Sequence, residues 1–496
     1  GMLADARDRA ARIPATISAD GETITYTGEE FNPNRRAAAK SRIDEVFADI
    51  DAALDLANRA DRAAAAELKK LRPGYDPTNP GKGYVSRSEI PKRGTDPHKV
   101  NAWWRGLSPA ERQYLIHEHP ERIGWLDGIP VSARDQANRV RLANEHDKAD
   151  RRKERLKDRK AELEAELKRY PADNPHHNLM RNEIQDKLDK VNAELDVVNR
   201  NLKGMDTIES RLYDQPGKPR AYLIGFEPGT QADHDGNGEP DDDGKAIVAI
   251  GNPDTADHVA TYVPGTGADI GGVDSDIKRA DAMAYDAGMA APGEDTSVVM
   301  WLGYDAPDDV IPDAGLSSYA EDATGDLRGF QDGLRATHEG EPSHNTVIGH
   351  SYGSTVIGHT ASGDGGIAAD DLVFVGSPGV GVGSAAELNV PVEHVWSTTA
   401  KHDAINDIAG WHGGRDPSDH DFGGHVFKSN PGDPNDREGT HSDYWKDDTP
   451  RDNFAARDNF AAIITGQPDK VTSAPPDPPP QYGPRPGHPP RTGAPR

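Results

Sequence analysis

Apolar residues at helical spacing dominate residues 131–214 of the chain. Two runs place these residues seven positions apart or in alternating steps of four and three, the spacing that the seam between two packed helices requires. Prolines at 171 and 175 break the helix between the runs. The pattern predicts a long antiparallel helical hairpin of the coiled-coil type. Its seam positions are Leu142, Ala149, Leu156, Leu163 and Tyr170, followed by Ile184, Leu188, Val191, Leu195, Val198, Leu202 and Met205.

The residues before the hairpin, 1–130, also have a helical composition, with abundant Ala, Arg, Glu and Asp. Ser108, Pro109 and Glu111 mark a helix start. A serine N-cap with glutamate three residues later forms a capping box, and proline is favoured at the first helical position. We therefore predict an all-α region before the hairpin. The helical segments either cover a functional site as a lid or bind a protein partner.

After residue 214 the chain changes to short β-rich runs separated by Gly, Pro and Asp. Several runs are apolar at consecutive positions, as strands covered on both faces are. Helical patterns fall between them at 277–289, 327–337 and 352–360. The alternation predicts an α/β domain over residues 215–470 with a doubly wound, mostly parallel sheet. The predicted strands are 221–226, 246–250, 260–263, 297–302, 346–348, 372–375, 392–396 and 425–427.

Composition adds a tail and several exclusions. Residues 471–496 are rich in proline and are expected to be disordered or to form polyproline II. The 57 Lys and Arg against 84 Asp and Glu give a net charge of −27, which argues against a nucleic-acid partner because phosphate contacts need clustered positive charge. The chain has no cysteine, which excludes disulfides and thiolate chemistry.

The sequence also bears on the compartment. No apolar run approaches the roughly 18 residues that span a bilayer, and the first residues lack the charged and apolar regions of a signal peptide. We expect a soluble protein without a transmembrane segment. It is either cytoplasmic or exported by a non-classical route, and the compartment stays open.

One motif carries chemistry, the Gly-His-Ser-Tyr-Gly sequence centred on Ser351. It lies between the predicted strand 346–348 and the predicted helix 352–360, and its Gly-x-Ser-x-Gly spacing is typical of a nucleophile elbow. Gly349 and Gly353 leave room where strand and helix come too close for a Cβ. The turn lifts the serine hydroxyl above the sheet edge, close to a helix N-terminus. We interpret Ser351 as a nucleophile.

A serine hydroxyl needs a base and an orienting acid. In folds with a nucleophile elbow, these follow the serine along the chain in the order acid, then histidine. Asp403 lies in the loop after a predicted strand and is the preferred acid, with Asp407 as the fallback. His441 lies between the last strand and the last helix, where the fold delivers the base. We expect His350 and His402 to be packing or rim residues. The alternatives for the base are His412, His420 and His425.

Two backbone N–H groups are needed to form an oxyanion hole. The residue after the nucleophile, Tyr352, supplies the first. The loop 263–267 has the sequence Val-Pro-Gly-Thr-Gly and leaves a predicted strand, so we expect Thr266 to supply the second.

These motifs, in this order, resemble a bacterial α/β-hydrolase family whose substrate is unassigned. The resemblance spans about residues 247–445, and Trp103-Trp104 with residues 123–130 resemble the helical lead-in of that family. It implies an α/β-hydrolase with Ser351 as nucleophile, but no substrate. The segments that carry it are 250–258, Tyr262-Val-Pro-Gly-Thr-Gly267, Trp301-Leu-Gly-Tyr-Asp-Ala-Pro307, Gly349-His-Ser-Tyr-Gly353 and Val375-Gly-Ser-Pro378.

We therefore predict a serine hydrolase without a cofactor that cleaves a small-molecule or lipid ester through an acyl-enzyme, as an esterase or lipase does. Thioesters and amides are alternative substrates. The alternative function is a non-enzymatic interaction or export-associated scaffold that uses the hairpin and the proline-rich tail.

A calcium loop is a rival site. Asp233, Asp235 and Asn237 match its first three ligand positions, and Gly238 matches the glycine at position six. Gly244 stands where the bidentate glutamate is expected. We interpret the segment as an acidic loop without metal, with calcium binding as the alternative.

Overall fold

The computed structural model describes the residues 15–17, 24–26, 85–230, 243–308, 317–408, 414–446 and 455–475. The chain divides into two compact units, Gly1–Ser86 and Arg87–Arg496. The calcium candidates Asp233, Asp235 and Asn237 lie outside the described residues, as does His412.

In the first unit two strands depart from the all-helical prediction. Strand β1 (Ala15–Ile17) pairs antiparallel with β2 (Ile24–Tyr26). Both contain β-branched Thr and Ile residues, and an Asp-Gly dipeptide at 20–21 lies between them in the sequence. β-branched residues favour strands over helices, so the local pattern outweighs the helical composition of the region at these positions.

In the second unit eight strands of the described residues form one sheet, in the order β10-β9-β8-β7-β5-β6-β4-β3. The strands from β10 to β6 pair in parallel, whereas β3, β4 and β6 pair antiparallel. The predicted mostly parallel α/β sheet is confirmed. The bounds are β3 (Ala221–Pro228), β4 (Gly244–Ile250), β5 (His258–Val263), β6 (Thr296–Leu302), β7 (His344–His350), β8 (Asp371–Val375), β9 (Val395–Thr398) and β10 (His425–Val426).

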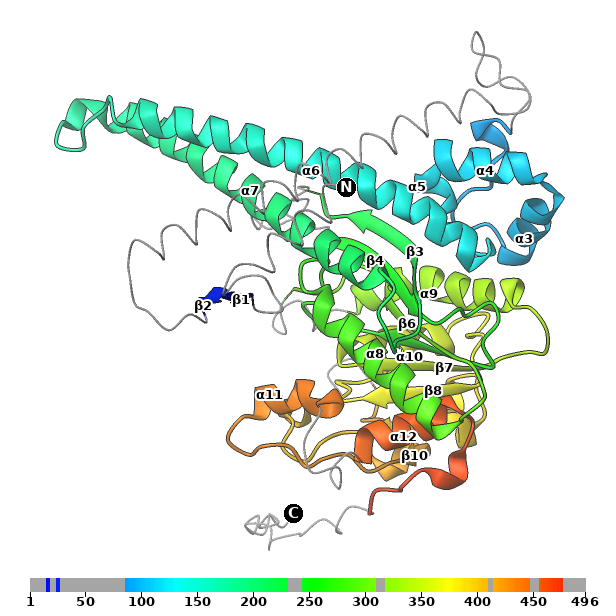
Figure 1. The fold of residues 1–496 in the computed structure, drawn as a ribbon. Coiled ribbons are helices and arrows are strands. Elements are labelled where there is room, and N and C mark those ends of the chain that lie inside the picture. The colour runs from blue at the N-terminus through cyan, green and yellow to red at the C-terminus, as the bar shows by residue number, and fades with distance from the viewer. Residues whose placement is uncertain are drawn as a thin grey trace, which may run out of the picture. The chain divides into compact units, whose positions relative to one another are not determined.

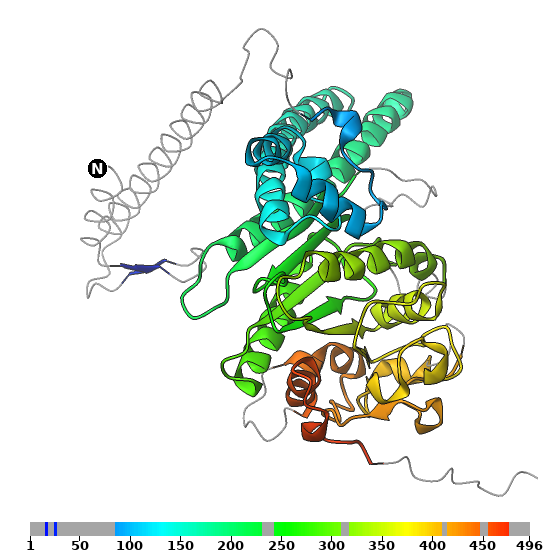
Figure 2. The same cartoon turned by 90° about the vertical axis from the view of Figure 1, so that its right-hand side faces the viewer.

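Helices cover both faces of this sheet (Figures 1 and 2). Helices α8 (Val273–Ala290) and α12 (Ala455–Ile464) pack together on one face, and α9 (Ser318–Thr337) and α10 (Tyr352–Ser362) pack together on the other. Strands β5 and β8 are therefore buried along their whole length, as their consecutive apolar positions predict.

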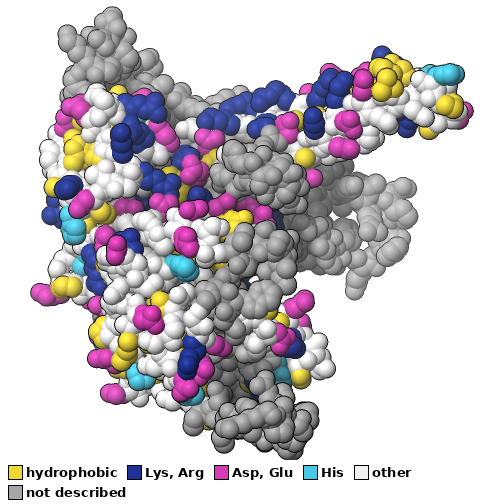
Figure 3. All heavy atoms as spheres, turned by 180° about the vertical axis from the view of Figure 1, so that it is seen from behind, with side chains coloured by type: hydrophobic (Ala, Val, Ile, Leu, Met, Phe, Trp, Pro, Cys, Tyr) yellow, Lys and Arg dark blue, Asp and Glu magenta, His cyan; other side chains and the backbone are white. Residues whose placement is uncertain are grey.

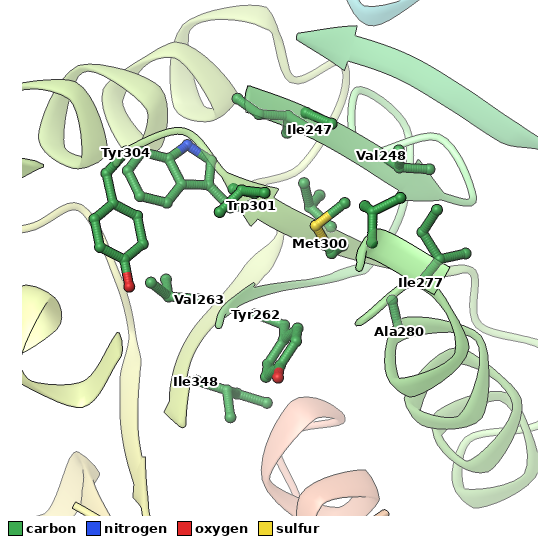
Figure 4. Close-up of a cluster of buried hydrophobic side chains, with 14 of the residues drawn as sticks. Ile247, Val248, Tyr262, Val263, Ile277, Ala280, Met300, Trp301, Tyr304 and Ile348 are labelled. Atoms are coloured by element: carbon green, nitrogen blue, oxygen red, sulfur yellow. The ribbon is translucent and has the colours of Figure 1, made fainter. Parts of the chain in front are cut away.

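Large side chains fix the central strands against one another (Figure 4). Trp301 of β6 is 1% exposed, and its ring stacks on Tyr304 with the centroids 6.0 Å apart. Tyr262 of β5 and Ile348 of β7 are fully buried in the same core. This packing holds the carboxyl ends of β5 and β7 side by side, and both strands lead into predicted site segments.

The predicted hairpin consists of α6 (Val131–Leu167) and α7 (Asn178–Leu212), which run antiparallel and extend beyond the sheet (Figure 1). Its predicted seam residues are buried, except that Ala149 and Tyr170 are partly buried. Neither helix, nor any other helix in the described residues, is long and apolar enough to cross a membrane. The exact domain limits stay a prediction.

Within residues 85–130, three short α-helices precede the hairpin: α3 (Pro97–Gly106), α4 (Pro109–Glu118) and α5 (Pro120–Ile123). The predicted capping box of α4 is confirmed: the Glu111 N–H donates to the Ser108 hydroxyl at 3.3 Å, and the Ser108 N–H donates to the Glu111 carboxylate at 2.7 Å.

The helical part is attached to the edge strand β3. The Leu223 N–H donates to the buried Asp135 carboxylate of α6 at 2.8 Å, and the Asn138 amide donates to the Leu223 carbonyl at 3.0 Å. The Trp125 indole N–H donates to the Phe226 carbonyl at 2.8 Å. Side chains thus occupy backbone groups of an edge strand that would otherwise stay open to pairing.

A buried network of charged side chains lies at the amino-terminal ends of the parallel strands. Asp371, the first residue of β8, accepts hydrogen bonds from His344 at 2.7 Å, Trp396 at 2.7 Å and His394 at 3.0 Å. Burial acts to raise the pKa of Asp371, but these hydrogen bonds outweigh it and hold the pKa below its usual value. Burial acts to lower the pKa of His344, but the bond to Asp371 outweighs it and raises the pKa.

We predict that Asp371→Asn lowers the free energy of unfolding by about 2–3 kcal/mol near pH 6, because it removes one partner of a buried ion pair. The stabilisation by Asp371 is lost as pH falls through its depressed pKa, and that by His344 is lost as pH rises through its elevated pKa. Urea unfolding between pH 3 and 9 should therefore show the largest difference from wild type in the middle of the range. The exposed control Asp364→Asn should behave as wild type, and a difference for Asp371→Asn that is constant with pH would contradict the assignment.

Candidate active site

Ser351 stands at the junction of β7 and α10 in a strained conformation. Its φ is 52° and its ψ is −128°, a region that non-glycine residues rarely adopt. The Ser351 N–H donates to the Val375 carbonyl of β8 at 2.9 Å, and the Ser354 N–H donates to the Ser351 carbonyl at 3.0 Å. The backbone on both sides of the serine is thus fixed.

Close backbone contacts around Ser351 explain the glycines of the motif. A Cβ on Gly349 would lie 2.6 Å from the Ser354 backbone nitrogen, and a Cβ on Gly353 would lie 2.2 Å from the Val263 carbonyl oxygen. A Cβ on Gly265 would lie 2.7 Å from the Ser351 Cβ. The loop after β5 therefore packs directly against the elbow.

Asp403 and His441 form a hydrogen-bonded pair. The His441 Nδ1 lies 2.9 and 3.0 Å from the two carboxylate oxygens of Asp403. Asp403 is 0% exposed and also accepts from the Ile405 N–H at 2.8 Å. A buried carboxylate that faces Nδ1 orients the ring and favours the proton on Nδ1, so Nε2 is left to exchange a proton with another group.

Two further side chains hold this pair, and sequence reasoning missed both. The Tyr444 hydroxyl donates to Asp403 at 2.6 Å and accepts from the Ala400 N–H at 2.9 Å. Burial and the Asp403 charge raise the pKa of Tyr444 well above its usual value, so it stays a donor. The Arg437 guanidinium bonds Asp407 at 2.8 and 3.0 Å and the Asp403 carbonyl at 3.3 Å. The spacing of Tyr444 three residues after His441, one helical turn, was the available signal.

His350 is a packing residue, as expected, with an additional contact. Burial lowers its pKa well below the usual value, and the neighbouring His441 adds to the effect. The neutral ring donates from Nε2 to the His441 carbonyl at 2.7 Å. The elbow therefore bonds directly to the segment that carries His441.

Ser351 and His441 face one cavity of about 500 Å³. It is lined by Thr266, Ser351, Tyr352, Pro378, Ala404, Ile405, Asp407, Ile408, Glu438 and His441. The structure thus brings the predicted nucleophile, base and both predicted oxyanion residues together, with the acid directly behind the base.

The other candidates lie elsewhere or are engaged. Asp407 lines the cavity but is paired with Arg437, whereas Asp403 bonds His441. His420 and His425 are exposed and are not among the lining residues of this cavity, and His402 is half-buried in the loop that holds Asp403. The described residues contain no group of acidic and histidine side chains suited to a metal.

The described helices before β3 contribute no lining residue to this cavity. This observation disfavours the lid interpretation for residues 85–212, although α7 contacts a loop next to the cavity, as shown below.

The comparisons with known proteins agree with this fold. Residues 239–412 match a family model described as alpha/beta hydrolase. These residues thus lie in a domain with the α/β-hydrolase fold, and the resemblance predicted from the motifs is confirmed. Two uncharacterized Mycobacterium tuberculosis proteins, from strains CDC 1551 and H37Rv, are 32% identical over 361 residues, which are 70% of this chain and 49% of theirs. The chain therefore spans about half the length of these relatives.

Another relative and two solved structures complete the comparison. An uncharacterized Mycobacterium bovis protein is 32% identical over 167 residues, 32% of this chain and 62% of that protein. A hyperthermophilic esterase from Pyrobaculum calidifontis has 15% identity and a TM-score of 0.34 over 57% of this chain and 96% of its own. A Rhizomucor miehei esterase has 12% identity and a TM-score of 0.32 over 54% of this chain and 89% of its own.

We predict that Gly353→Ala destabilises the protein by about 2–3 kcal/mol, because the added methyl group must displace the loop after β5. The matched control is Gly325→Ala in the exposed part of α9, where a Cβ meets nothing within 4 Å. It should be neutral or stabilising by up to about 1 kcal/mol. Thermal unfolding compares the two, and equal melting temperatures would show that the elbow is not sterically closed.

Proposed function

We propose that this protein is a serine hydrolase that cleaves carboxylic esters through an acyl-enzyme. The observation that carries the proposal is that His441, paired with the buried Asp403, and Ser351, at a strained elbow, border the same cavity. Buried carboxylate, imidazole and serine in this order are the parts of a nucleophilic triad.

The reaction follows from these positions. The His441 Nε2 takes the proton of the Ser351 hydroxyl while Oγ attacks the ester carbonyl, and the tetrahedral oxyanion is held by the Tyr352 and Thr266 N–H groups. Protonated His441 then gives its proton to the leaving alcohol, which departs as the carbonyl reforms. A water molecule then gives a proton to His441 and attacks the carbonyl of the acyl-Ser351 ester. The carboxylic acid is released, and the Ser351 oxygen takes the proton back from His441. Asp403 keeps the imidazole in the required tautomer throughout.

The walls of the cavity favour an ester with an apolar acyl group. Pro378, Ala404, Ile405 and Ile408 supply apolar surface, and the volume of about 500 Å³ fits a small-molecule site. The carboxylates of Asp407 and Glu438 also line the cavity. A neutral acyl chain of short to medium length meets no like charge there, whereas an anionic one does.

The test is hydrolysis of p-nitrophenyl esters with acyl chains from two to sixteen carbons. We expect turnover with a maximum at short or medium length, and a loss of about 10³-fold or more in kcat for Ser351→Ala. The matched control Ser362→Ala removes a hydroxyl later in the same helix, outside the cavity, and should retain activity. Absence of turnover by the wild type on every ester, or undiminished turnover by Ser351→Ala, would reject the proposal.

A further inference from the structure

The root of the hairpin, by which we mean the part of α7 that carries Arg200 and Gly204, contacts the segment that follows the proposed oxyanion donor. We call residues 264–272, which connect β5 to α8, the oxyanion loop. Gly204 of α7 approaches this loop so closely that a Cβ there would lie 2.1 Å from the Ile270 carbonyl oxygen. The stem of Arg200, one turn earlier, lies against Gly271, where a Cβ would be 3.3 Å from the Arg200 Cβ.

Arg200 also pairs with Asp243, the residue before β4. Its guanidinium lies 3.2 Å from the Asp243 carboxylate, with the two side chains 39% and 16% exposed. The Ile270 N–H in turn donates to the Asp243 carbonyl at 3.3 Å. Arg200 therefore holds the oxyanion loop at two points. Its side-chain stem contacts Gly271 directly, and its guanidinium pairs with Asp243, whose carbonyl accepts the hydrogen bond from Ile270.

The other side of the oxyanion loop is tied to the segment after β6. The Gly267 N–H donates to the Pro307 carbonyl at 2.8 Å, and the next residue, Asp308, hydrogen-bonds to the Asp243 side chain. The Ala268 N–H donates to the Gly265 carbonyl at 3.2 Å and closes a turn around Thr266. Asp243 thus connects Arg200 to the oxyanion loop, through Ile270, and to the segment after β6, through Asp308.

The carboxyl groups around Asp243 make the positive charge of Arg200 important. Burial and the hydrogen bond that the protonated Asp243 carboxyl donates to Asp308 raise the pKa of Asp243 to about 7. The charges of Asp308 and Asp269 act in the same direction, and Arg200 acts against them. Three carboxyl groups meet here, so their mutual repulsion would separate the segments as they ionise. The guanidinium offsets that repulsion and keeps the segments together.

We infer that Arg200 is a positioning residue for the proposed oxyanion hole, and that the root of the hairpin sets the place of the Thr266 N–H. The inference rests on the proposed function of Ser351. It gives the hairpin a role in catalysis without any contact with substrate. Lys and Arg side chains also lie along the projecting part of the hairpin (Figure 3), which supplies a control. Arg152 of α6 pairs with Glu194 of α7 at 3.0 Å, within the hairpin itself.

The test compares Arg200→Ala, Arg200→Lys and the control Arg152→Ala in the full chain. For Arg200→Ala we expect kcat for the best p-nitrophenyl ester to fall about tenfold to a hundredfold, because oxyanion donors act through precise placement. KM should stay within twofold, and inhibition by a trifluoromethyl ketone, which mimics the oxyanion, should weaken in proportion to kcat/KM. Arg200→Lys should restore most of the activity, and Arg152→Ala should match the wild type.

A second variant keeps the inference open to refutation if Arg200→Ala unfolds. Gly204→Ala leaves every charge in place but pushes on the Ile270 carbonyl, so it should also lower kcat without raising KM. Wild-type kcat in both variants, a change confined to KM, or an equal loss in Arg152→Ala would overturn the inference. Since wild type and Ser351→Ala are measured in the same assay, turnover by the first and not by the second keeps the proposed function intact whatever the Arg200 variants do.

Discussion

The close approach of three backbone segments around Ser351 is the constraint on which the rest of the site depends. Strand β7, helix α10 and the loop after β5 meet where Gly349, Gly353 and Gly265 have no room for a Cβ. The buried aromatic core beneath them keeps β5 and β7 in register and so maintains the strain at Ser351. The same contacts place the serine, a helix N-terminus and a small-residue loop at one point of the sheet edge, which is what stabilisation of an oxyanion requires.

The two edges of the sheet use buried carboxylates differently. At the amino-terminal ends of the parallel strands, Asp371 accepts hydrogen bonds from two histidines and a tryptophan. Asp371 is the first residue of β8, at the end of the strand away from the cavity, and these bonds hold the strand ends together. At the carboxyl edge Asp403 bonds His441, Tyr444 and a backbone N–H, and the histidine borders the cavity. A carboxylate with three donors is stable where it is buried, so the imidazole it orients can exchange protons without the acid moving.

Features set by neighbours in the chain were predictable from sequence, and those set by distant contacts were not. The capping box at Ser108, the seam of the hairpin and the glycine spacing around Ser351 each follow from a short stretch. Asp403 and His441 were proposed from the order of elements in the fold, which restricts where the acid and the base can lie, and the structure pairs the two side chains. Arg437 acts through a tertiary contact, and the bond between Arg200 and Asp243 joins residues of different layers, so no local pattern predicts them. For Tyr444 the local signal is its spacing of three residues from His441, which does not by itself predict the bond to Asp403.

The proposed chemistry requires that Ser351 is activated as a nucleophile in the folded protein. Reaction of the full chain with a fluorophosphonate, followed by peptide mass spectrometry, tests this most directly because the probe reacts with serines that a neighbouring base activates. We expect a single adduct, on the peptide that contains Ser351, and we expect it to disappear when the protein is unfolded before the probe is added. No adduct on the folded protein, or an adduct at another serine with Ser351 unmodified, would contradict it.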